Sequence, residues 1–234
     1  SAAFLIAVSI RRNDVADVAW GLLFIVASVV LMIATHSFHM RAILIAGLVT
    51  LWGLRLSLHI FLRMRGKPED FRYQQWRKEW GRWWIVRSYL QVFLLQGLFA
   101  LLILLPVLIG IESIDVQYSS LIPLGVTVWL IGFIFETVGD YQLKKFLQTR
   151  TKPHAVMQSG LWSLTRHPNY FGEVSQWWGI WLIACTAPYG WMTIVGPVTI
   201  TVLIIGISGI PMLEKKYVGN KEFDAYKKRT NAFF

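Results

Sequence analysis

Long apolar runs separated by short charged stretches dominate the sequence. A helix that crosses a membrane needs about 20 apolar residues, and the runs that approach or exceed this length are 18–35, 42–62, 88–111, 116–135 and 174–213. The last run holds two helices, because "APYG" at 187–190 breaks it. The pattern predicts an all-α fold, a polytopic membrane helical bundle.

Two further segments complete the predicted fold. Residues 1–10, "SAAFLIAVSI", are apolar but end at Arg11, and no initiator Met precedes them. We interpret them as the end of a first helix whose beginning is missing, which gives about seven transmembrane helices with the first truncated. The charged and aromatic stretch "RGKPEDFRYQQWRKEWGRWW" at 65–84 predicts a short interfacial helix over 68–84. It either anchors the chain at the membrane surface or covers a cytoplasmic site.

Composition and charge agree with this prediction. The chain is 55% hydrophobic and 15% charged, with a mean hydropathy of +0.50, whereas soluble domains carry about 25% charged residues. We expect one integral membrane domain over 1–234. The net charge of +10 does not indicate nucleic-acid binding, because the basic residues separate apolar runs. Eight Lys and Arg lie in 63–87, five in 144–166 and six in 215–229, with only Arg41 on the opposite side. This asymmetry predicts an outside N-terminus and a cytoplasmic C-terminus.

Ionisable residues inside the N-terminal spans form two groups. Asp14 and Asp17 lie three residues apart where a helix begins, so they share a face. They are either acids that complement the helix dipole or, for the deeper Asp17, a functional group. Arg55, His59 and Arg63 form a stripe on the next span. Arg55 is too deep to reach the surface easily, so we expect it to meet an acid such as Asp17 or an anionic ligand.

A second stripe extends from the apolar run at 116–135. Glu136, Asp140 and Lys144 are spaced four residues apart, so they lie on one helix face. They are either helix-end groups or, as we favour, the rim of a ligand site. Asp140 can accept hydrogen bonds from a sugar hydroxyl or a base amine.

The stretch "SLTRHPNYFGE" at 163–173 places polar residues where a hydrophobic helix must begin. Pro168 suits the first turn of a helix and disfavours helix at the preceding residue. The free N–H groups of that turn, together with Arg166 and His167, suit a phosphate-bearing cofactor; the alternative is an ordinary helix cap. The polar and aromatic candidates here are Arg166, His167, Asn169, Tyr170 and Glu173. His167 lacks a second His at ligand spacing, so we predict no metal site.

Three segments resemble a known family. "GLWSLTRHPNYFGE" (160–173) resembles a segment of membrane steroid 5α-reductases and sterol reductases, and more loosely of isoprenylcysteine carboxyl methyltransferases. "FETVGDYQLKKF" (135–146) and "LEKKYVGNKEFDAYKKRTNAFF" (213–234) are similar as well. The resemblance covers about 130–234, which would be the cofactor half. It is greatest to bacterial members, which implies a bacterial inner membrane.

The resemblance implies an NADPH-dependent oxidoreductase that reduces an activated C=C bond in a steroid or another lipid. The implied catalytic positions are Asp17, Trp52 and Arg55, with Trp52 standing where the family has a tyrosine. The cofactor-binding candidates are Glu136, Asp140, Lys144, Arg166, His167, Asn169, Tyr170, Glu173, Tyr217 and Tyr226. The expected partners are the lipid substrate and membrane lipids, with no nucleic acid and no protein partner implied.

Two alternatives stay open. One is an S-adenosylmethionine-dependent methyltransferase acting on a lipid or a prenylated thiol; the thirteen Lys and Arg in the two middle cytoplasmic loops favour a nucleotide over this cofactor. The other is a transporter or structural bundle, which would need a polar path across the whole membrane. The polar residues instead gather toward the side predicted to be cytoplasmic.

Overall fold

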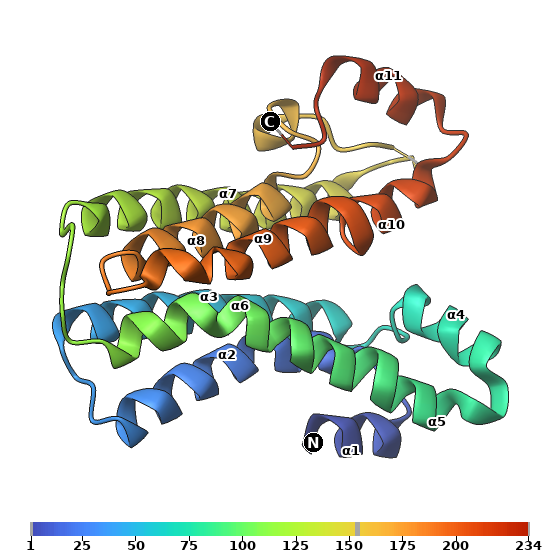
Figure 1. The fold of residues 1–234 in the computed structure, drawn as a ribbon. Helices are drawn as coiled ribbons and strands as arrows, with labels where there is room; N and C mark the ends of the chain where they lie inside the picture. Colours follow the sequence, from blue (N-terminus) through green and yellow to red (C-terminus); the bar gives the residue numbers. More distant parts are fainter. Residues whose placement is uncertain (1, 153–154, 234) are drawn as a thin grey trace. The chain divides into compact units, whose positions relative to one another are not determined.

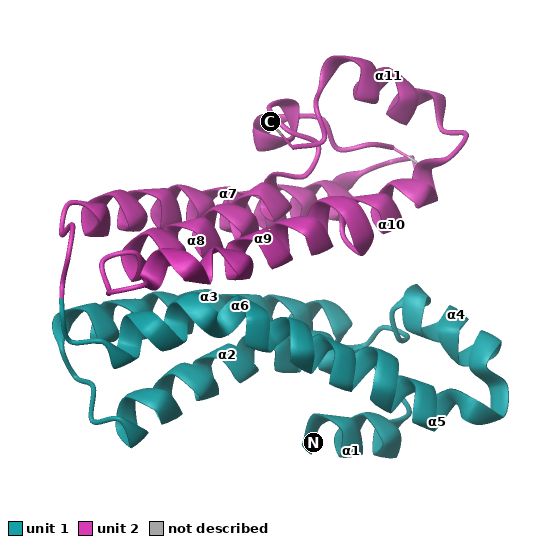
Figure 2. Ribbon diagram, in the orientation of Figure 1, with its two compact units in different colours: residues 1–115 teal, residues 116–234 magenta. Residues whose placement is uncertain are grey.

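The computed structural model describes residues 2–152 and 155–233 and divides the chain into two compact units, 1–115 and 116–234 (Figures 1 and 2). The described residues form helices and no strands, which confirms the all-α prediction. Five helical segments among them are long and apolar enough to cross a membrane: Val15–Ala34, Met40–Met64, Phe71–Glu112, Leu121–Thr149 and Gly190–Tyr217. The chain is therefore a polytopic membrane protein, although the predicted number of about seven spans is not confirmed.

The first unit carries the N-terminal helices, including the segment predicted to be a truncated first span. Its helices are α1 (Ala2–Ile10), α2 (Val15–Ala34), α3 (Met40–Met64), α4 (Phe71–Trp80), α5 (Trp84–Arg87) and α6 (Leu95–Glu112). A 3₁₀ turn (Gly81–Trp83) follows α4, and a π-helical segment (Ser88–Leu94) joins α5 to α6. Asp70 caps α4 by accepting a hydrogen bond from the Arg72 amide at 3.0 Å. The predicted helix at 68–84 is thus present, but shorter and bent into two pieces.

The second unit carries the cofactor half of the prediction. Its helices are α7 (Leu121–Thr149), α8 (Pro168–Ala184), α9 (Val195–Val202), α10 (Ile210–Glu214) and α11 (Lys221–Arg229). A π-helical segment (Leu203–Ile207) follows α9, and 3₁₀ turns lie at Gly160–Ser163, Gly190–Ile194 and Lys215–Tyr217. Pro168 occupies the first turn of α8, as predicted. The helix ends at Ala184, shortly before the break predicted at 187–190. Helix α7 continues beyond the apolar run that ends at 135, so the Glu136–Asp140–Lys144 stripe lies on the same helix, as predicted.

Close glycine contacts bring α7 and α8 together along their length. A Cβ atom added at Gly172 would lie 2.4 Å from the Gly132 carbonyl oxygen, and one added at Gly179 would lie 2.6 Å from that of Gly125. Any side chain at these positions would force the two backbones apart. Small residues of this kind are how helices pack closely in membranes. The close approach holds the polar faces of α7 and α8 against each other.

The first unit uses the same device between α2 and α3. A Cβ atom at Gly21 would lie 2.5 Å from the Gly53 carbonyl oxygen. One turn further along α3, the Ser57 hydroxyl donates to the Val18 carbonyl at 2.9 Å. This crossing fixes the start of α2, and with it Asp17, against the middle of α3.

Arg41, the one basic residue predicted on the outer side, has a structural role. Its side chain is buried, and its guanidinium donates to the carbonyls of Gly110 at 3.0 Å and Asp115 at 2.9 Å. The last carbonyls of a helix have no partner within the helix and carry partial negative charge. Arg41 therefore satisfies carbonyl groups at the end of α6. This role explains why one basic residue lies on the predicted outer side, which has no other Lys or Arg.

Candidate functional site

Two side-chain pairs join the polar stripe of α7 to the start of α8. The Asn169 amide donates to Asp140 Oδ1 at 3.1 Å, and the Gln176 amide donates to Glu136 Oε2 at 2.6 Å. The second pair is fully buried, and Gln176 Oε1 has no hydrogen-bond partner among the described residues. Buried polar groups in a membrane helix are costly and usually serve a function. The predicted cofactor residues of these two segments therefore meet on one pair of helices.

Lys144 and Glu173 extend this face in the two directions expected from helical spacing. Lys144 lies one turn beyond Asp140 on α7 and is exposed. Glu173 lies one turn beyond Asn169 on α8 and is partly buried. Asp140 and Asn169 thus lie between a cation and an acid that are both accessible to solvent.

Arg166 and His167 precede α8 and converge on a residue that the sequence did not single out, Glu214 at the end of α10. Arg166 donates to Glu214 Oε1 from Nε at 3.0 Å and from a terminal nitrogen at 2.8 Å. His167 Nε2 lies 3.1 Å from the same oxygen, and Lys227 Nζ lies 3.2 Å from the other. A third Arg166 nitrogen donates to the Thr230 carbonyl at 2.6 Å. Glu214 thus gathers three potentially cationic side chains from two parts of the chain.

The protonation of His167 follows from its surroundings. A carboxylate only accepts hydrogen bonds, so the bond to Glu214 requires a proton on His167 Nε2. Burial lowers the pKa of His167, against the opposing effect of Glu214. Its ring also stacks on Tyr170 at a centroid distance of 5.7 Å. At neutral pH His167 is therefore a neutral donor whose ring is held by Glu214 and Tyr170.

The C-terminal segment contacts this region through hydrogen bonds to backbone carbonyls. The Arg166 amide donates to the Asn231 carbonyl at 2.9 Å, and the Thr165 hydroxyl donates to the Ala232 carbonyl at 3.0 Å. The buried Tyr226 hydroxyl donates to the Trp162 carbonyl. Tyr217 stacks on Phe223 in the same cluster, at a centroid distance of 4.5 Å. Both predicted tyrosines therefore anchor α11, and their contact with a cofactor stays a prediction.

Replacing Tyr226 with Phe is expected to destabilise the protein by about 1–2 kcal/mol, because the Trp162 carbonyl loses its donor. Burial raises the pKa of Tyr226 to about 12, above an ordinary value of about 10. The favourable contribution of the phenol is complete while both folded and unfolded chains keep it protonated. It is lost as the pH rises through the folded pKa. Thermal unfolding from neutral to strongly alkaline pH should therefore show the two proteins converging, and a pH-independent difference would contradict this account.

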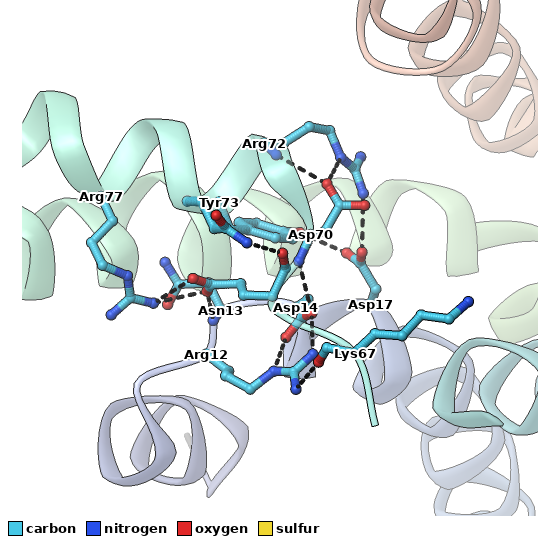
Figure 3. Close-up of polar contacts among 11 residues, drawn as sticks. Arg12, Asn13, Asp14, Asp17, Lys67, Asp70, Arg72, Tyr73 and Arg77 are labelled. Carbon is cyan, nitrogen blue, oxygen red and sulfur yellow. Dashed lines mark hydrogen bonds and ion pairs between the residues drawn. The ribbon is translucent and has the colours of Figure 1, made fainter. Parts of the chain in front are cut away.

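In the first unit, Asp17 is held by two residues of α4 (Figure 3). The Tyr73 hydroxyl donates to Asp17 Oδ1 at 2.6 Å, and Arg72 donates to Oδ2 at 3.1 Å. The Tyr73 ring is buried against Ala16, Trp80 and Val92. The Asp17 carboxylate therefore accepts one hydrogen bond from a phenol and one from a guanidinium, and Tyr73 is the hydroxyl donor of the pair.

Asp14 has a different role from Asp17. Its carboxylate bonds to Arg12 at 2.8 Å and accepts from the Asp70 amide at 3.1 Å, which ties the start of α2 to the start of α4 (Figure 3). Glu69 accepts hydrogen bonds from the backbone N–H of Asn13 at 2.6 Å and from the Arg77 guanidinium at 2.8 Å in the same network. These contacts give Asp14 a structural role and leave Asp17 as the functional candidate.

The remaining substrate-side candidates lie on α3. Trp52 is buried and packs edge-on against Phe24 at a centroid distance of 5.4 Å. Arg55 is partly buried, whereas Arg63 is exposed near the end of the helix, as expected for a side chain that reaches the surface. The predicted pairing of Arg55 with Asp17 stays a prediction. The three catalytic candidates belong to the first unit and the ten cofactor candidates to the second.

Sequence reasoning missed Arg72, Tyr73 and Glu214. Each had a weak signal: Arg72 and Tyr73 lie in the charged aromatic stretch at 65–84, and Glu214 is the lone acid between an apolar run and two lysines. Within residues 2–152 and 155–233, no group of three or more His, Cys, Asp and Glu side chains is arranged to hold a metal ion.

Comparisons with known proteins add one finding. A family described as "Protein of unknown function (DUF1295)" matches residues 3–230. No curated protein and no solved structure matches the chain significantly.

Proposed function

We propose that this chain, which belongs to the DUF1295 family over nearly its whole length, is an NADPH-dependent membrane reductase that acts on an activated C=C bond of a lipid. The observation that carries the proposal is the meeting of two segments that resemble the reductase cofactor site. Asp140 on α7 pairs with Asn169 on α8, beside the Arg166–His167 pair that precedes α8. This arrangement supports a cofactor site at one end of one helix pair.

The side chains present fit a phosphate-bearing dinucleotide. Arg166 and Lys227 supply positive charge and donors for phosphate, and His167 supplies a neutral donor. Asp140 supplies carboxylate oxygen for hydroxyl or amine groups. Lys144 adds an exposed cation on the same helix face. When bound, NADPH supplies the hydride that the reduction needs.

The first unit supplies the groups for the substrate. Reduction of an enone adds a hydride to its β-carbon and a proton to its α-carbon, and charge accumulates on the carbonyl oxygen between these events. We assign the stabilisation of that oxygen to the Tyr73 hydroxyl, whose single proton turns from Asp17 Oδ1 to the substrate oxygen when substrate binds, while Arg72 continues to hold the Asp17 carboxylate. Donors fixed in advance and shielded from water are the largest source of rate enhancement in such reactions. In this proposal Tyr73 has the role of the family tyrosine at whose position this chain has Trp52.

The cofactor is tested by thermal unfolding of the purified protein with nucleotides. NADPH and NADP⁺ are expected to raise the unfolding temperature, because a ligand that binds only the folded state stabilises it. Stabilisation by S-adenosylhomocysteine without any by NADP⁺ would instead identify a methyltransferase. No response to NADPH or NADP⁺ at high concentration would remove the basis of the proposal.

A matched pair of lysines locates the cofactor on α7. Lys144→Gln is expected to weaken NADP⁺ binding about tenfold, the effect of losing one charge-assisted contact. Lys145→Gln removes the same charge from a neighbour that is also exposed but lies off the Glu136–Asp140 stripe. Equal losses in the two variants would mean that only the overall charge matters. Isothermal titration distinguishes the outcomes.

A further inference from the structure

The four contacts on Glu214 describe an anion site formed by the chain itself. Arg166 contributes two of them, at 3.0 and 2.8 Å, and His167 adds one at 3.1 Å, all on one oxygen. Lys227 contacts the other oxygen at 3.2 Å. Donors from two separate segments, the loop before α8 and helix α11, thus converge on a single carboxylate.

The charges of this cluster do not balance. Arg166 and Lys227 carry two positive charges, whereas Glu214 carries one negative charge. The Arg166 side chain is 8% exposed and that of Glu214 14%, so this pair is largely shielded from solvent, whereas Lys227, which adds the second positive charge, is 46% exposed. Arg166 has five N–H donors, and three are used by bonds within the described chain. The site therefore has charge and donors for an anion larger than a carboxylate.

We propose that Glu214 occupies this site in the free protein and that a phosphate group displaces its carboxylate when ligand binds; the identification of that phosphate with NADPH rests on the function proposed above. A phosphate monoester carries nearly two negative charges and three acceptor oxygens. It therefore balances Arg166 and Lys227 more completely than Glu214 does.

The position of Glu214 suits a side chain that leaves. It is the last residue of the five-residue helix α10, between Gly209 and Gly219, whose φ is +84°. Helix α11 is anchored separately from Glu214, by Phe223 and Tyr226. Displacement of Glu214 thus leaves the donors supplied by the α8 loop and α11 in place.

The test compares anion binding by Glu214→Gln and a matched control. We expect Glu214→Gln to bind inorganic pyrophosphate about tenfold more tightly than the wild type, since a competing charge-assisted contact is removed. Glu222→Gln removes the same charge from an exposed position on α11 that bonds to Gln158 instead, and should bind as the wild type does. Adding Arg166→Gln to Glu214→Gln should abolish the gain. Unchanged or weaker binding by Glu214→Gln would show that Glu214 only braces Arg166.

A second variant keeps the proposal testable if Glu214→Gln does not fold. Lys227 is 46% exposed, and its replacement by Gln should weaken pyrophosphate binding several-fold without loss of folding; wild-type affinity would overturn the proposal. Parallel titrations with NADP⁺ separate the two hypotheses. Tighter pyrophosphate binding without any NADP⁺ binding would retain the anion site and reject the reductase. Equal NADP⁺ binding by wild type and Glu214→Gln would retain the reductase and reject the displacement of Glu214 by phosphate.

Discussion

Replacing Tyr73 with Phe is expected to lower the rate of enone reduction about 100-fold, the lower end of what a positioned proton donor contributes. The substitution removes one hydroxyl and keeps the ring that packs against Ala16, Trp80 and Val92. The bond of 2.6 Å to Asp17 is lost, but Arg72 still holds the carboxylate. Turnover should therefore fall while NADP⁺ binding, which we assign to the second unit, is unchanged. The measurement is NADPH oxidation with an enone lipid in detergent or nanodiscs.

Tyr89 provides the control for this experiment. It is 41% exposed, and its ring packs against Phe4 at a centroid distance of 5.0 Å. Tyr89→Phe should retain wild-type turnover. A Tyr73→Phe enzyme that keeps turnover within about threefold would exclude Tyr73 from the chemistry, because a positioned proton donor contributes about 100-fold or more.

Replacing Gly172 with Ala is expected to lower the free energy of unfolding by about 3 kcal/mol or more. The new Cβ atom would lie 2.4 Å from the Gly132 carbonyl oxygen and 2.5 Å from the Glu136 amide nitrogen. Both obstacles are backbone atoms, so relief requires α7 and α8 to separate. Separation also weakens the contact of Glu136 with Gln176, so NADP⁺ should bind less tightly as well. Thermal and denaturant unfolding measure the first effect and titration the second.

Gly97→Ala is the matched control, because a Cβ atom there meets no heavy atom within 4 Å in the described structure. Alanine favours helix over glycine by about 1 kcal/mol, so this variant should be as stable as the wild type or more so. Similar destabilisation by both substitutions would mean that the glycine contacts between α7 and α8 do not limit stability.

Much of the fold follows from the sequence because the membrane restricts the choices. Long apolar runs can only be helices, and Pro168 and "APYG" mark a helix start and a break that the structure confirms. Spacing of four residues places Glu136, Asp140 and Lys144 on one face once the helix is known. The number of spans is harder to predict, because α1 and α8 are shorter than a full crossing.

The contacts that define the candidate site depend on residues far apart in the chain. Tyr73 reaches Asp17 across 56 positions, and Arg166 reaches Glu214 across 48. No periodicity within a helix predicts such contacts, because they depend on how a turn or a short helix folds back. A resemblance confined to local motifs also cannot indicate that Tyr73, which lies outside those motifs, donates a hydrogen bond to Asp17.

The glycines between α7 and α8 have one more consequence. Gly125, Gly132 and Gly139 recur every seven residues, as do Gly172 and Gly179. A slide of the antiparallel helices by seven residues, about 10 Å, would pair Gly132 with Gly179 and Gly139 with Gly172. Small residues alone therefore permit two registers of this helix pair. The observed register is selected by polar contacts, Asp140 with Asn169 and Glu136 with Gln176. Side chains assigned to ligand binding thus also determine which of two well-packed alignments the membrane helices adopt.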